Sequence, residues 1–490
     1  MSETRVWTQV SSPVLIGLLM LAEMNHAFEQ NMIQLALPHL YADFGDPVTV
    51  GWSITGYALV AAATAATAGR LGDVLGRKRV LIAALLLGTA GSMVALLWPT
   101  LPGIILGRAI QGTTGAILGL AFGIARERVG ERNLAMVLSL LSGTALIGGP
   151  IGQFVAGLLI DGVGWHAIFA FSAGLAALTV VLVWVLLPGS PATGKLRDVD
   201  LGSGLIFAAA VAAILLGITL IGKTNGAVAI ALITAGAVAL AAFVILSVRS
   251  PHPAVDFRTF KDGRVAVAHA MMFVMAFGVL AFWLVLAVAL QSPQATGLGL
   301  GLGAASTGAV MGIASIIGGA IASPLSSVLT RKFGVPAALG AGSAFVLAGA
   351  LILLLSPVVS PFLLAVGGGI AIIGSGFLYA AIPILLMTGV PVERTSEAGN
   401  VNQVMKSVGL AAGPLMFSAI LASQTLTLGD KTLAAPGAYV TGFTVLAGAG
   451  VILLVLSGIA AFVVRQNRTA STSTATFDSP DPSPEADYVH

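Results

Sequence analysis

The sequence predicts an all-α integral membrane protein with fourteen transmembrane helices, organised as two pseudo-symmetric six-helix bundles plus an inserted two-helix hairpin. The first observation is composition: 57% of the 490 residues are hydrophobic and only 9% are charged, with a mean hydropathy of +0.99. A soluble globular chain carries about 25% charged residues, so this chain belongs in lipid. The second observation is a series of fourteen apolar runs, and the third is a charged turn that occurs twice.

Each apolar run is long enough to cross a bilayer core of about 30 Å as a helix. The first run contains carboxylates and lacks an Ala-x-Ala-like exit, so we expect it to remain as a span rather than be cleaved as a signal peptide. The runs are Val14–Pro38, Trp52–Leu71, Val80–Trp98, Gly103–Ala125, Leu134–Ile160, His166–Leu187, Leu201–Ile221, Ala227–Val248, Val265–Leu290, Gly301–Val328, Ala337–Leu355, Phe362–Met387, Asn400–Ser423 and Tyr439–Val464.

The placement of basic residues orients these predicted spans. With the amino terminus in the cytoplasm, all but four of the 23 lysines and arginines fall in cytoplasmic loops and tails. Lys223 and Lys431 fall outside, whereas Arg108 and Lys406 lie within spans. Cytoplasmic loops of membrane proteins carry such an excess of positive charge. We therefore expect a multi-pass protein of the cell (plasma) membrane with both termini in the cytoplasm.

A basic turn follows the second run and recurs after the tenth. The first copy is Gly69–Val80, and its four positive charges and one carboxylate require a solvated position. The second copy, Ser323–Phe333, repeats its leucine, valine and basic positions, with Arg331 in the place of Arg77, 254 positions earlier. A turn that occurs twice between apolar runs predicts two related halves.

The spacing of the two turns also predicts an insertion. Six-span halves would place the copies six spans apart, but eight spans separate them, so two spans are inserted, most simply the nearly apolar pair Leu201–Ile221 and Ala227–Val248. From Arg465 onward the chain is rich in Ser, Thr and Pro, which indicates disorder. The expected organisation is a cytoplasmic tail (1–12), an N-terminal six-helix bundle (13–187), the lipid-facing hairpin with cytoplasmic linkers (188–264), a C-terminal six-helix bundle (265–464) and a disordered cytoplasmic tail (465–490).

Several stretches resemble motifs of the major facilitator superfamily, and some of these are typical of its fourteen-span drug:proton antiporters. Two departures stand out: Glu29 replaces the aspartate of the antiporters' first helix, and Gln153 and Phe154 replace the closing glycines of their fifth-helix motif. The matching stretches are Gly69–Val80 (loop between helices two and three), Leu106–Ala116 (fourth helix), Gly143–Gly152 (fifth helix), Phe28–Pro38 (first helix), Trp165–Phe169 and Val392–Asn402.

The resemblance implies a secondary active transporter that exports small amphipathic compounds or drugs in exchange for protons by alternating access. It also implies that Asp73 and Arg77 latch the cytoplasmic ends of the two halves. The physical basis for the latch is Asp73 against the positive amino terminus of the span that begins near Asn400. The expected gating residues are Gly69, Asp73, Gly76, Arg77, Lys78, Gly149 and Pro150.

Two other functions use the same motifs. An exporter dedicated to one endogenous lipid or secondary metabolite shares every motif, and substrate profiling of the purified protein would discriminate it. A non-transporting membrane receptor on the same fold is disfavoured by the intact acids and loop. An enzyme is not expected, since no nucleophile–base pair can be placed.

The first span is unusually polar. At about 100° per residue, Glu23, His26, Glu29, Gln30 and Gln34 share one broad face, which must look into a cavity or the bundle interior. A carboxyl group held away from water takes up a proton more readily than one in solvent, as a proton carrier requires. The plainer interpretation is a packing network of satisfied amides, but two carboxylates exceed what packing needs.

Arg108 and Glu29 are expected to lie at matching depths, about 10 Å below the outer surface at 1.5 Å per residue. An ion pair that protonation or substrate breaks is therefore feasible, and a static structural pair is the alternative. His26 lies one turn from both Glu23 and Glu29 and could relay protons or be a hydrogen-bonded bystander. The proton-coupling candidates are Glu29, Glu23, Arg108 and His26.

A central cavity between the halves is expected to bind a small amphipathic or cationic substrate. His269 and Lys406, nearer the cytoplasmic side, are interpreted as snorkelling side chains. The expected cavity residues are Gln30, Gln34, Gln111, Asn402 and Gln403.

Cofactors and other partners are not expected. The chain has no cysteine, which excludes disulfides and thiolate metal sites, and no cluster of residues with metal-ligand spacing. It contains no Walker loop, and Gly297–Gly303 follows no strand, so neither ATP nor a dinucleotide is indicated. We expect a monomer that works with protons, its substrate and the lipid bilayer, without nucleic acid.

Overall fold

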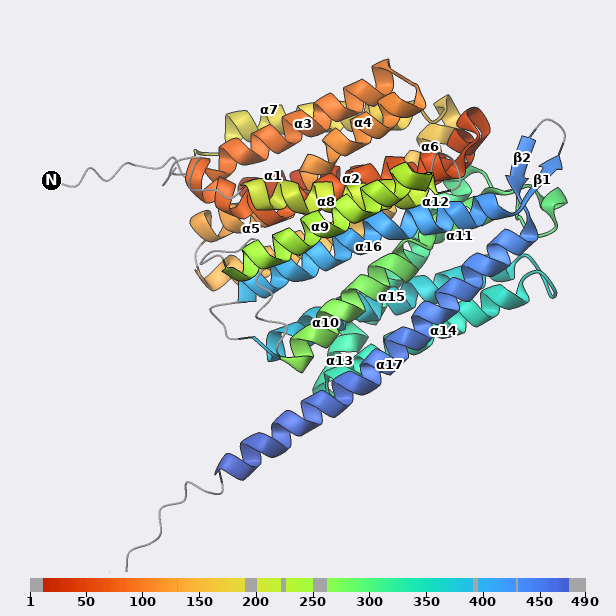
Figure 1. The fold of residues 1–490 in the computed structure, drawn as a ribbon. Coiled ribbons are helices and arrows are strands. Elements are labelled where there is room, and N and C mark those ends of the chain that lie inside the picture. The colour runs from red at the N-terminus through yellow and green to blue at the C-terminus, as the bar shows by residue number, and fades with distance from the viewer. Residues whose placement is uncertain are drawn as a thin grey trace, which may run out of the picture.

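The computed structural model describes residues 12–129, 131–189, 201–221, 226–249, 262–390, 395–428 and 431–475. These residues form a bundle of long helices with one short β-hairpin (Figure 1). The N-terminal group of helices contains α1 Ser12–Phe44, α2 Pro47–Leu75, α3 Arg77–Leu97, α4 Leu101–Gln111, the 3₁₀ turn η1 Gly112–Ala116, α5 Ile117–Arg128, α6 Glu131–Val163 and α7 Ala167–Leu186.

The remaining elements are the pair α8–α9 and a C-terminal group. The pair is α8 Leu201–Leu220 and α9 Gly226–Arg249. The C-terminal group contains α10 Gly263–Val274, the π-helical η4 Met275–Leu280, α11 Trp283–Gln291, η5 Gln294–Thr296, α12 Ala304–Ile317, the π-helical η6 Gly318–Ala322, α13 Ser323–Phe333, α14 Val335–Leu355, α15 Leu363–Thr388, α16 Thr395–Ser423, β1 Thr425–Leu428, β2 Lys431–Ala434 and α17 Pro436–Ala475.

Each of the fourteen predicted apolar runs contains helix, and the all-α prediction is confirmed. Ten helical runs among the described residues are long and apolar enough to cross a membrane by length and composition, and three shorter apolar helices accompany them. Local sequence explains several helix starts. Asp46 accepts a hydrogen bond from the Val48 amide before Pro47, and Asp262 does the same for Arg264 at the start of α10.

Two predictions about the ends of elements need correction. Helix α17 continues to Ala475, past the expected start of the disordered tail at Arg465, because each added residue extends a helix by one hydrogen bond and no Pro or Gly interrupts this stretch. The antiparallel pair β1–β2, in register Thr425 opposite Ala434, was not predicted. The expected tail residues 476–490, residues 1–11 and most of the two linkers around α8–α9 lie outside the described residues.

The two groups of helices repeat the same packing. A Cβ atom on Gly91 of α3 would lie 2.5 Å from the carbonyl oxygen of Gly107 on α4, and one on Gly349 of α14 would lie 2.5 Å from that of Gly367 on α15. Both helix pairs therefore approach to backbone contact, which only glycine permits. Gly76 separates α2 from α3 with φ 94°, and Gly334 separates α13 from α14 with φ 87°.

The predicted register between the two charged turns is wrong by one helical turn. The equivalent glycines, Gly76 and Gly334, are 258 positions apart rather than 254. Arg77 therefore starts α3 after the break, whereas Arg331 lies in the last turn of α13 before it. A helix repeats its faces every 3.6 residues, so a slip of four residues still matched the leucine and valine pattern.

The pair α8–α9 packs against the seam between the two groups. Phe207, Leu215 and Phe243 of the pair cluster with Leu59 of α2 and Leu415 of α16. In addition, Trp52 Nε1 donates to Thr219 Oγ1 at 3.2 Å. Only 17% of the apolar window in α9 is buried, so the outer helix keeps the exposed apolar surface expected of a lipid-facing hairpin. Its inner helix, however, also bridges α2 and α16.

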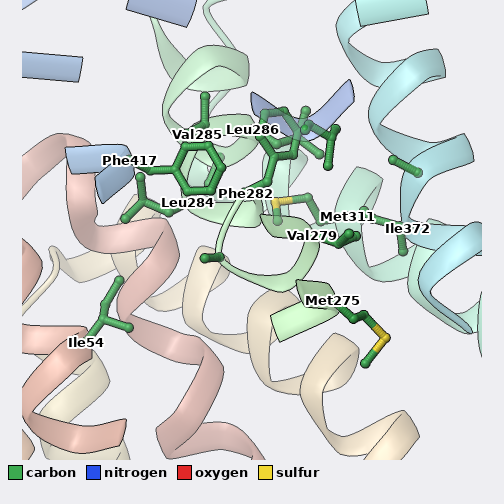
Figure 2. Close-up of a cluster of buried hydrophobic side chains, with 14 of the residues drawn as sticks. Ile54, Met275, Val279, Phe282, Leu284, Val285, Leu286, Met311, Ile372 and Phe417 are labelled. Carbon is green, nitrogen blue, oxygen red and sulfur yellow. The ribbon is translucent and has the colours of Figure 1, made fainter. Parts of the chain in front are cut away.

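The largest hydrophobic cluster lies in the C-terminal group and extends to α1 and α2 (Figure 2). The Phe282 ring lies with its centroid 5.8 Å from that of Phe417 and 5.9 Å from that of Phe443, in edge-on arrangements that aromatic pairs favour. Ile54 of α2 and Ile372 of α15 mark the two sides of this region. The cluster fixes α11 beside the space between the two groups.

Two terms describe positions along the bundle. The β end carries β1 and β2, and the turn end is the opposite end of the bundle (Figure 1). At the turn end, α2 meets α3 at Gly76 and α13 meets α14 at Gly334.

The glycine contact between α3 and α4 yields a stability prediction. Gly91→Ala places a methyl group against the backbone of Gly107 and should cost about 1–3 kcal/mol, which lowers the melting temperature in detergent. Gly119→Ala is the matched control, because nothing lies within 4 Å of its Cβ position, and it should melt at or above the wild-type temperature. Equal melting of Gly91→Ala and wild type would contradict the observed contact.

Candidate functional site

A central cavity of about 210 Å³ lies between the two groups of helices. Its apolar walls include Ala58, Leu118, Leu280, Ile372 and Leu410, so it suits the apolar body of a small molecule. Polar and charged side chains line the rest. They are Glu23, His26, Gln30, Asn31, Gln34, Tyr57, Trp283, Ser315, Ser375, Tyr379, Gln403, Lys406 and Ser407.

Irregular turns within the helices form part of the cavity wall. Gly115 of the 3₁₀ turn η1 lines it, as do Leu280 of η4 and Gly318 and Gly319 of η6. Backbone that leaves α-helical geometry at membrane depth is tolerated where it is buried in protein or lines a cavity. Single π-helical turns of this kind occur often at functional sites.

Close contacts between the groups close the cavity toward the β end. Thr55 Oγ1 of α2 donates to the Ala411 carbonyl oxygen of α16 at 2.8 Å. Between α6 and α12, a Cβ atom on Gly157 would lie 2.6 Å from the Ala304 carbonyl oxygen, and one on Gly308 would lie 2.7 Å from that of Gln153. Small residues therefore allow α6 and α12 to approach to backbone distance, and a side-chain hydrogen bond joins α2 to α16.

A carboxylate crosses this closed interface. Asp161, near the end of α6, accepts hydrogen bonds from the backbone amides of Ala304 at 2.9 Å and Ala305 at 2.8 Å. These amides begin α12 of the other group, where the helix dipole is positive. The sequence did not single out Asp161, because only the fold brings it to another helix's amino terminus.

Glu29 is fully buried just behind the cavity wall. Thr114 Oγ1 donates to Glu29 Oε2 at 2.8 Å, and Ser172 Oγ donates to Oε1 at 3.1 Å. Gly88 of α3 leaves the room for this carboxyl group, since its Cβ position lies 3.2 Å from Glu29 Oε1 and 2.7 Å from the Thr114 methyl group. Helices α1, α3, η1 and α7 thus enclose one acidic side chain.

Arg108 lies at the depth of Glu29, as predicted, but does not form the expected ion pair with its carboxylate. The guanidinium donates instead to the Glu29 main-chain oxygen at 2.6 Å and to the Ser53 main-chain oxygen at 3.1 Å, and it lies 4.3 Å from the Tyr57 ring centroid. Depth along a helix follows from residue number, whereas the direction of a side chain depends on its neighbours. The Glu29 side chain turns toward the hydroxyl groups of η1 and α7.

Gln111 belongs to this buried network and not to the cavity. Its Oε1 accepts from Arg108 Nη1 at 2.9 Å, and its Nε2 donates to Ser92 Oγ at 2.6 Å. Ser92 and Ser172 hydroxyls lie 3.0 Å apart, and Ser172 reaches Glu29. A closed ring of hydrogen bonds therefore joins the carboxyl side chain and the main chain of Glu29 through four residues, which are Ser172, Ser92, Gln111 and Arg108.

His26 connects the cavity to the buried carboxyl group. Its Nδ1 lies 2.8 Å from Tyr57 Oη and 3.3 Å from Thr114 Oγ1, and Thr114 contacts Glu29. His26 itself lines the cavity. A proton donor and acceptor thus stands between the open space and Glu29, the geometry that a relay requires.

Glu23 faces the cavity directly. It is 2% exposed, and its Oε2 has no hydrogen-bond partner among the described residues. Of the five predicted cavity residues, Gln30, Gln34 and Gln403 line the cavity. Gln111 and Asn402 do not.

His269 and Lys406 do not snorkel as predicted. His269 is buried, with Nδ1 3.4 Å from Asn402 Oδ1, which joins α10 to α16. Lys406 lines the cavity and donates to Tyr379 Oη at 3.0 Å. The position of Lys406 along its span suggested that its side chain extends toward the membrane surface. Instead, Tyr379 of the facing helix α15 accepts its hydrogen bond.

The expected gating residues fall into three sets. Gly76 forms the α2–α3 turn, and Arg77 bonds within its own group, to the Gly123 carbonyl oxygen at 2.6 Å and Glu127 at 3.0 Å. Lys78 donates to the Trp184 carbonyl oxygen at 2.8 Å, and Gly149 and Pro150 line the cavity. The side chains of Asp73 and Asn400 lie outside those that the structure describes, as does Gly69 beyond its helical backbone, so the Asp73 latch stays a prediction.

Comparison with known proteins agrees with this architecture. A family model described as Major Facilitator Superfamily matches residues 19–199, which include most of α1, the α2–α3 turn, Arg108 and α6. Multidrug resistance protein Stp of Mycobacterium tuberculosis is 29% identical over 411 residues, which cover 80% of this chain and 72% of its own length. The chain belongs to the major facilitator superfamily. It is therefore a multi-pass membrane transporter and not an enzyme.

Two further relatives extend the likeness. The probable actinorhodin transporter of Streptomyces coelicolor is 26% identical over 464 residues, which cover 87% of this chain and 77% of its own length. Among solved structures, the peptide transporter POT in complex with sulfate superposes with a TM-score of 0.67 over 94% of this chain and 96% of its own. At 16% identity, that superposition speaks for the superfamily fold alone.

Proposed function

We propose that this superfamily member exports small amphipathic compounds in exchange for protons by alternating access, with fourteen membrane spans and both termini in the cytoplasm. The observation that carries the proposal is Glu29, an enclosed carboxyl group that is linked to the cavity by Thr114 and His26 and forms no ion pair with any described residue. Relatives named as multidrug resistance proteins support the substrate class.

Thr114 can serve both charge states of Glu29. Its hydroxyl group lies 2.8 Å from Glu29 Oε2 and 2.8 Å from the Gln111 carbonyl oxygen, but it has only one hydrogen to donate. When Glu29 is ionised, Thr114 donates to the carboxylate. When Glu29 is protonated, its own O–H donates to Thr114, which then donates to Gln111. Neither state leaves a buried polar group unpaired at this position, so proton uptake and release carry a small structural cost.

The contacts at the β end correspond, in this proposal, to closure toward the exterior. The basic turns then lie in the cytoplasm, in accord with the bias of lysine and arginine. Export requires the α2–α16 and α6–α12 interfaces to separate in turn. The close glycine contacts of the α6–α12 interface suit such a movement.

A dedicated exporter of one endogenous product is the second candidate. It is favoured by the relative named as a probable actinorhodin transporter, which covers more of this chain than Stp does. The same proton site would serve either function. A broad panel of exported compounds supports the first candidate, and a single exported product supports the second.

Glu29→Gln tests the proton site. The amide keeps the shape and can still bond to Thr114 and Ser172, but it cannot carry a proton, so export driven by a pH gradient in proteoliposomes should fall at least about tenfold while substrate binding changes less than about threefold. Glu23→Gln should weaken coupling less, because Glu23 stands outside the hydrogen-bonded ring. Thr114→Val should slow export while leaving Glu29 titratable.

Asp43→Asn is the matched control for the loss of a carboxylate. Asp43 accepts a hydrogen bond from Trp165 Nε1 at 2.8 Å, at the β end of α1 and away from the cavity, so its replacement should leave export unchanged. Uphill, proton-driven export by the double variant Glu23→Gln/Glu29→Gln would show that the proposed antiport mechanism is wrong.

Asp161 should hold the β end closed. Asp161→Ala removes two charge–amide contacts at the α12 amino terminus, worth about 1 kcal/mol, which shifts a near-balanced equilibrium several-fold toward an open β end. Because the chain has no cysteine, spin labels can be placed at Val163→Cys on α6 and Val358→Cys beyond α14, both highly exposed. Their distance distribution should lengthen in Asp161→Ala.

Asp262→Ala is the control for the distance measurement in Asp161→Ala. Asp262 also caps a helix, α10, but within one group and at the turn end, so its removal should not lengthen the Val163–Val358 distances. A distribution in Asp161→Ala that matches that of the unmodified protein would refute the role of Asp161 as a latch.

The span count can be tested by reporter fusions. Fourteen spans with a cytoplasmic amino terminus predict that fusions at Lys195 and Arg468 report the cytoplasm and that one at Lys223 reports the exterior. An exterior signal at Arg468 would exclude an even number of spans.

A further inference from the structure

The cavity has acidic and basic side chains on different walls. Three of its lining residues are acidic or basic: Glu23 and His26 on α1, and Lys406 on α16. The N-terminal wall thus contributes an acid, and the C-terminal wall contributes an ammonium group. Any molecule that fills the cavity lies between them.

Lys406 lacks the compensation that a cation within a membrane span usually has. Its Nζ donates to the neutral Tyr379 hydroxyl at 3.0 Å and lies 5.4 Å from the Tyr379 ring centroid, and no carboxylate of the described residues lies within 4.0 Å of it. A cation within a membrane span normally pairs with an acid or marks a ligand path.

Arg108 shows how this fold treats a structural cation. Its guanidinium is fully buried and donates to the Ser53 and Glu29 main-chain oxygens and to Gln111 Oε1 inside one group of helices. Lys406 differs from Arg108 because it faces the open space of the cavity and donates to a side chain rather than to main-chain oxygens. An ammonium group has three hydrogens, so Lys406 can still donate to a molecule in the cavity.

The same wall contains a second hydrogen-bond donor that has no acceptor among the described residues. Trp283 of α11 lines the cavity, and its buried Nε1 has no hydrogen-bond partner among the described residues. An indole N–H can only donate. Lys406, Tyr379 and Trp283 therefore give the C-terminal wall a surplus of donors, which a negatively charged or electron-rich group satisfies.

We propose that Lys406 and Tyr379 form a subsite for an anionic group, so that the preferred substrates are amphipathic molecules with a carboxylate or an acidic phenol on an apolar body. This inference rests on the proposed transport function and replaces the cationic substrate expected from the sequence. The apolar wall residues Ile54, Leu280 and Ile372 would contact the apolar body of the molecule. Because the subsite lies on the wall opposite Glu29, substrate and proton occupy separate places.

Binding of three matched probes tests the subsite without any proton gradient. The probes 9-anthracenecarboxylate, 9-anthracenemethanol and 9-anthracenemethylamine share one ring system and carry negative, zero and positive charge. Their fluorescence anisotropy is measured with the purified full chain in detergent. Wild type should bind the carboxylate about tenfold more tightly than the amine, as a charge-assisted hydrogen bond provides.

Substitutions at Lys406 should change the relative affinities of the three probes. Lys406→Gln should lower the affinity for the carboxylate probe about tenfold and the affinity for the alcohol probe less than about twofold. Lys406→Arg should keep the preference for the carboxylate probe. Tyr379→Phe should lower the affinity for the carboxylate probe by a smaller factor. It is a second substitution in the subsite, so the proposal can still be tested if a lysine variant does not fold. Lys332→Gln, which removes an exposed cation from the last turn of α13, should leave all three probes unchanged.

Several outcomes would overturn the proposal: a preference of wild type for the amine, equal affinity for the three probes, binding of none of them, or unchanged carboxylate binding in Lys406→Gln. Failure of the transport proposal looks different. In that case the carboxylate preference persists in detergent while proteoliposomes show no proton-driven export.

Discussion

The structure depends on one constraint, which is the enclosure of the Glu29 carboxyl group among α1, α3, η1 and α7 without an ion pair to any of the described residues. Ser172 and Thr114 satisfy its oxygens, and Gly88 provides the space that both need. The guanidinium of Arg108 is used elsewhere, on main-chain oxygens that tie α1 and α2 to α4. An acid in these surroundings can lose or gain a proton without breaking an ion pair, which would be costly in a membrane interior.

The second organising feature is the use of glycine and alanine wherever helices must approach or separate. Gly91 with Gly107, and Gly349 with Gly367, fix helix pairs inside each group at backbone distance. Between the groups, Gly157 closes the β end by the same means, assisted by the carboxylate of Asp161. Contacts of this type are close but carry few interlocked side chains. The same packing therefore serves rigid pairs within a group and a separable interface between groups.

Much of the fold could be predicted from the sequence, because apolar runs of membrane-spanning length admit helix and little else. The recurrence of Gly76 at Gly334 was detected, but four residues out of register, since the pattern that revealed it repeats almost every turn. The depth of Arg108 was predictable from counting residues. Its partner was not, because a side chain's direction follows from the helices that pack around it.

The polar face of the first span was the most informative part of the sequence. It pointed to Glu29 and Glu23 and to His26 between them, and the structure brings all three to the cavity or directly behind it. Lys406 was misjudged because its companion, Tyr379, is distant in sequence and becomes a neighbour only through α15–α16 packing. Thr114 lies within the matching stretch Leu106–Ala116, but neither it nor Ser172 was predicted as a site residue, because only the packing of the helices brings their hydroxyl groups to Glu29.

The measurement that tests the central claim most directly is proton release on substrate binding, recorded with an indicator dye in weakly buffered detergent solution. The neutral probe 9-anthracenemethanol is suitable because it carries no titratable group. If Glu29 is the proton site, wild type releases protons when the probe binds, binding strengthens as pH rises, and Glu29→Gln shows neither effect, since linkage makes the two effects reciprocal. Proton release from Glu29→Gln equal to that from wild type would contradict the account.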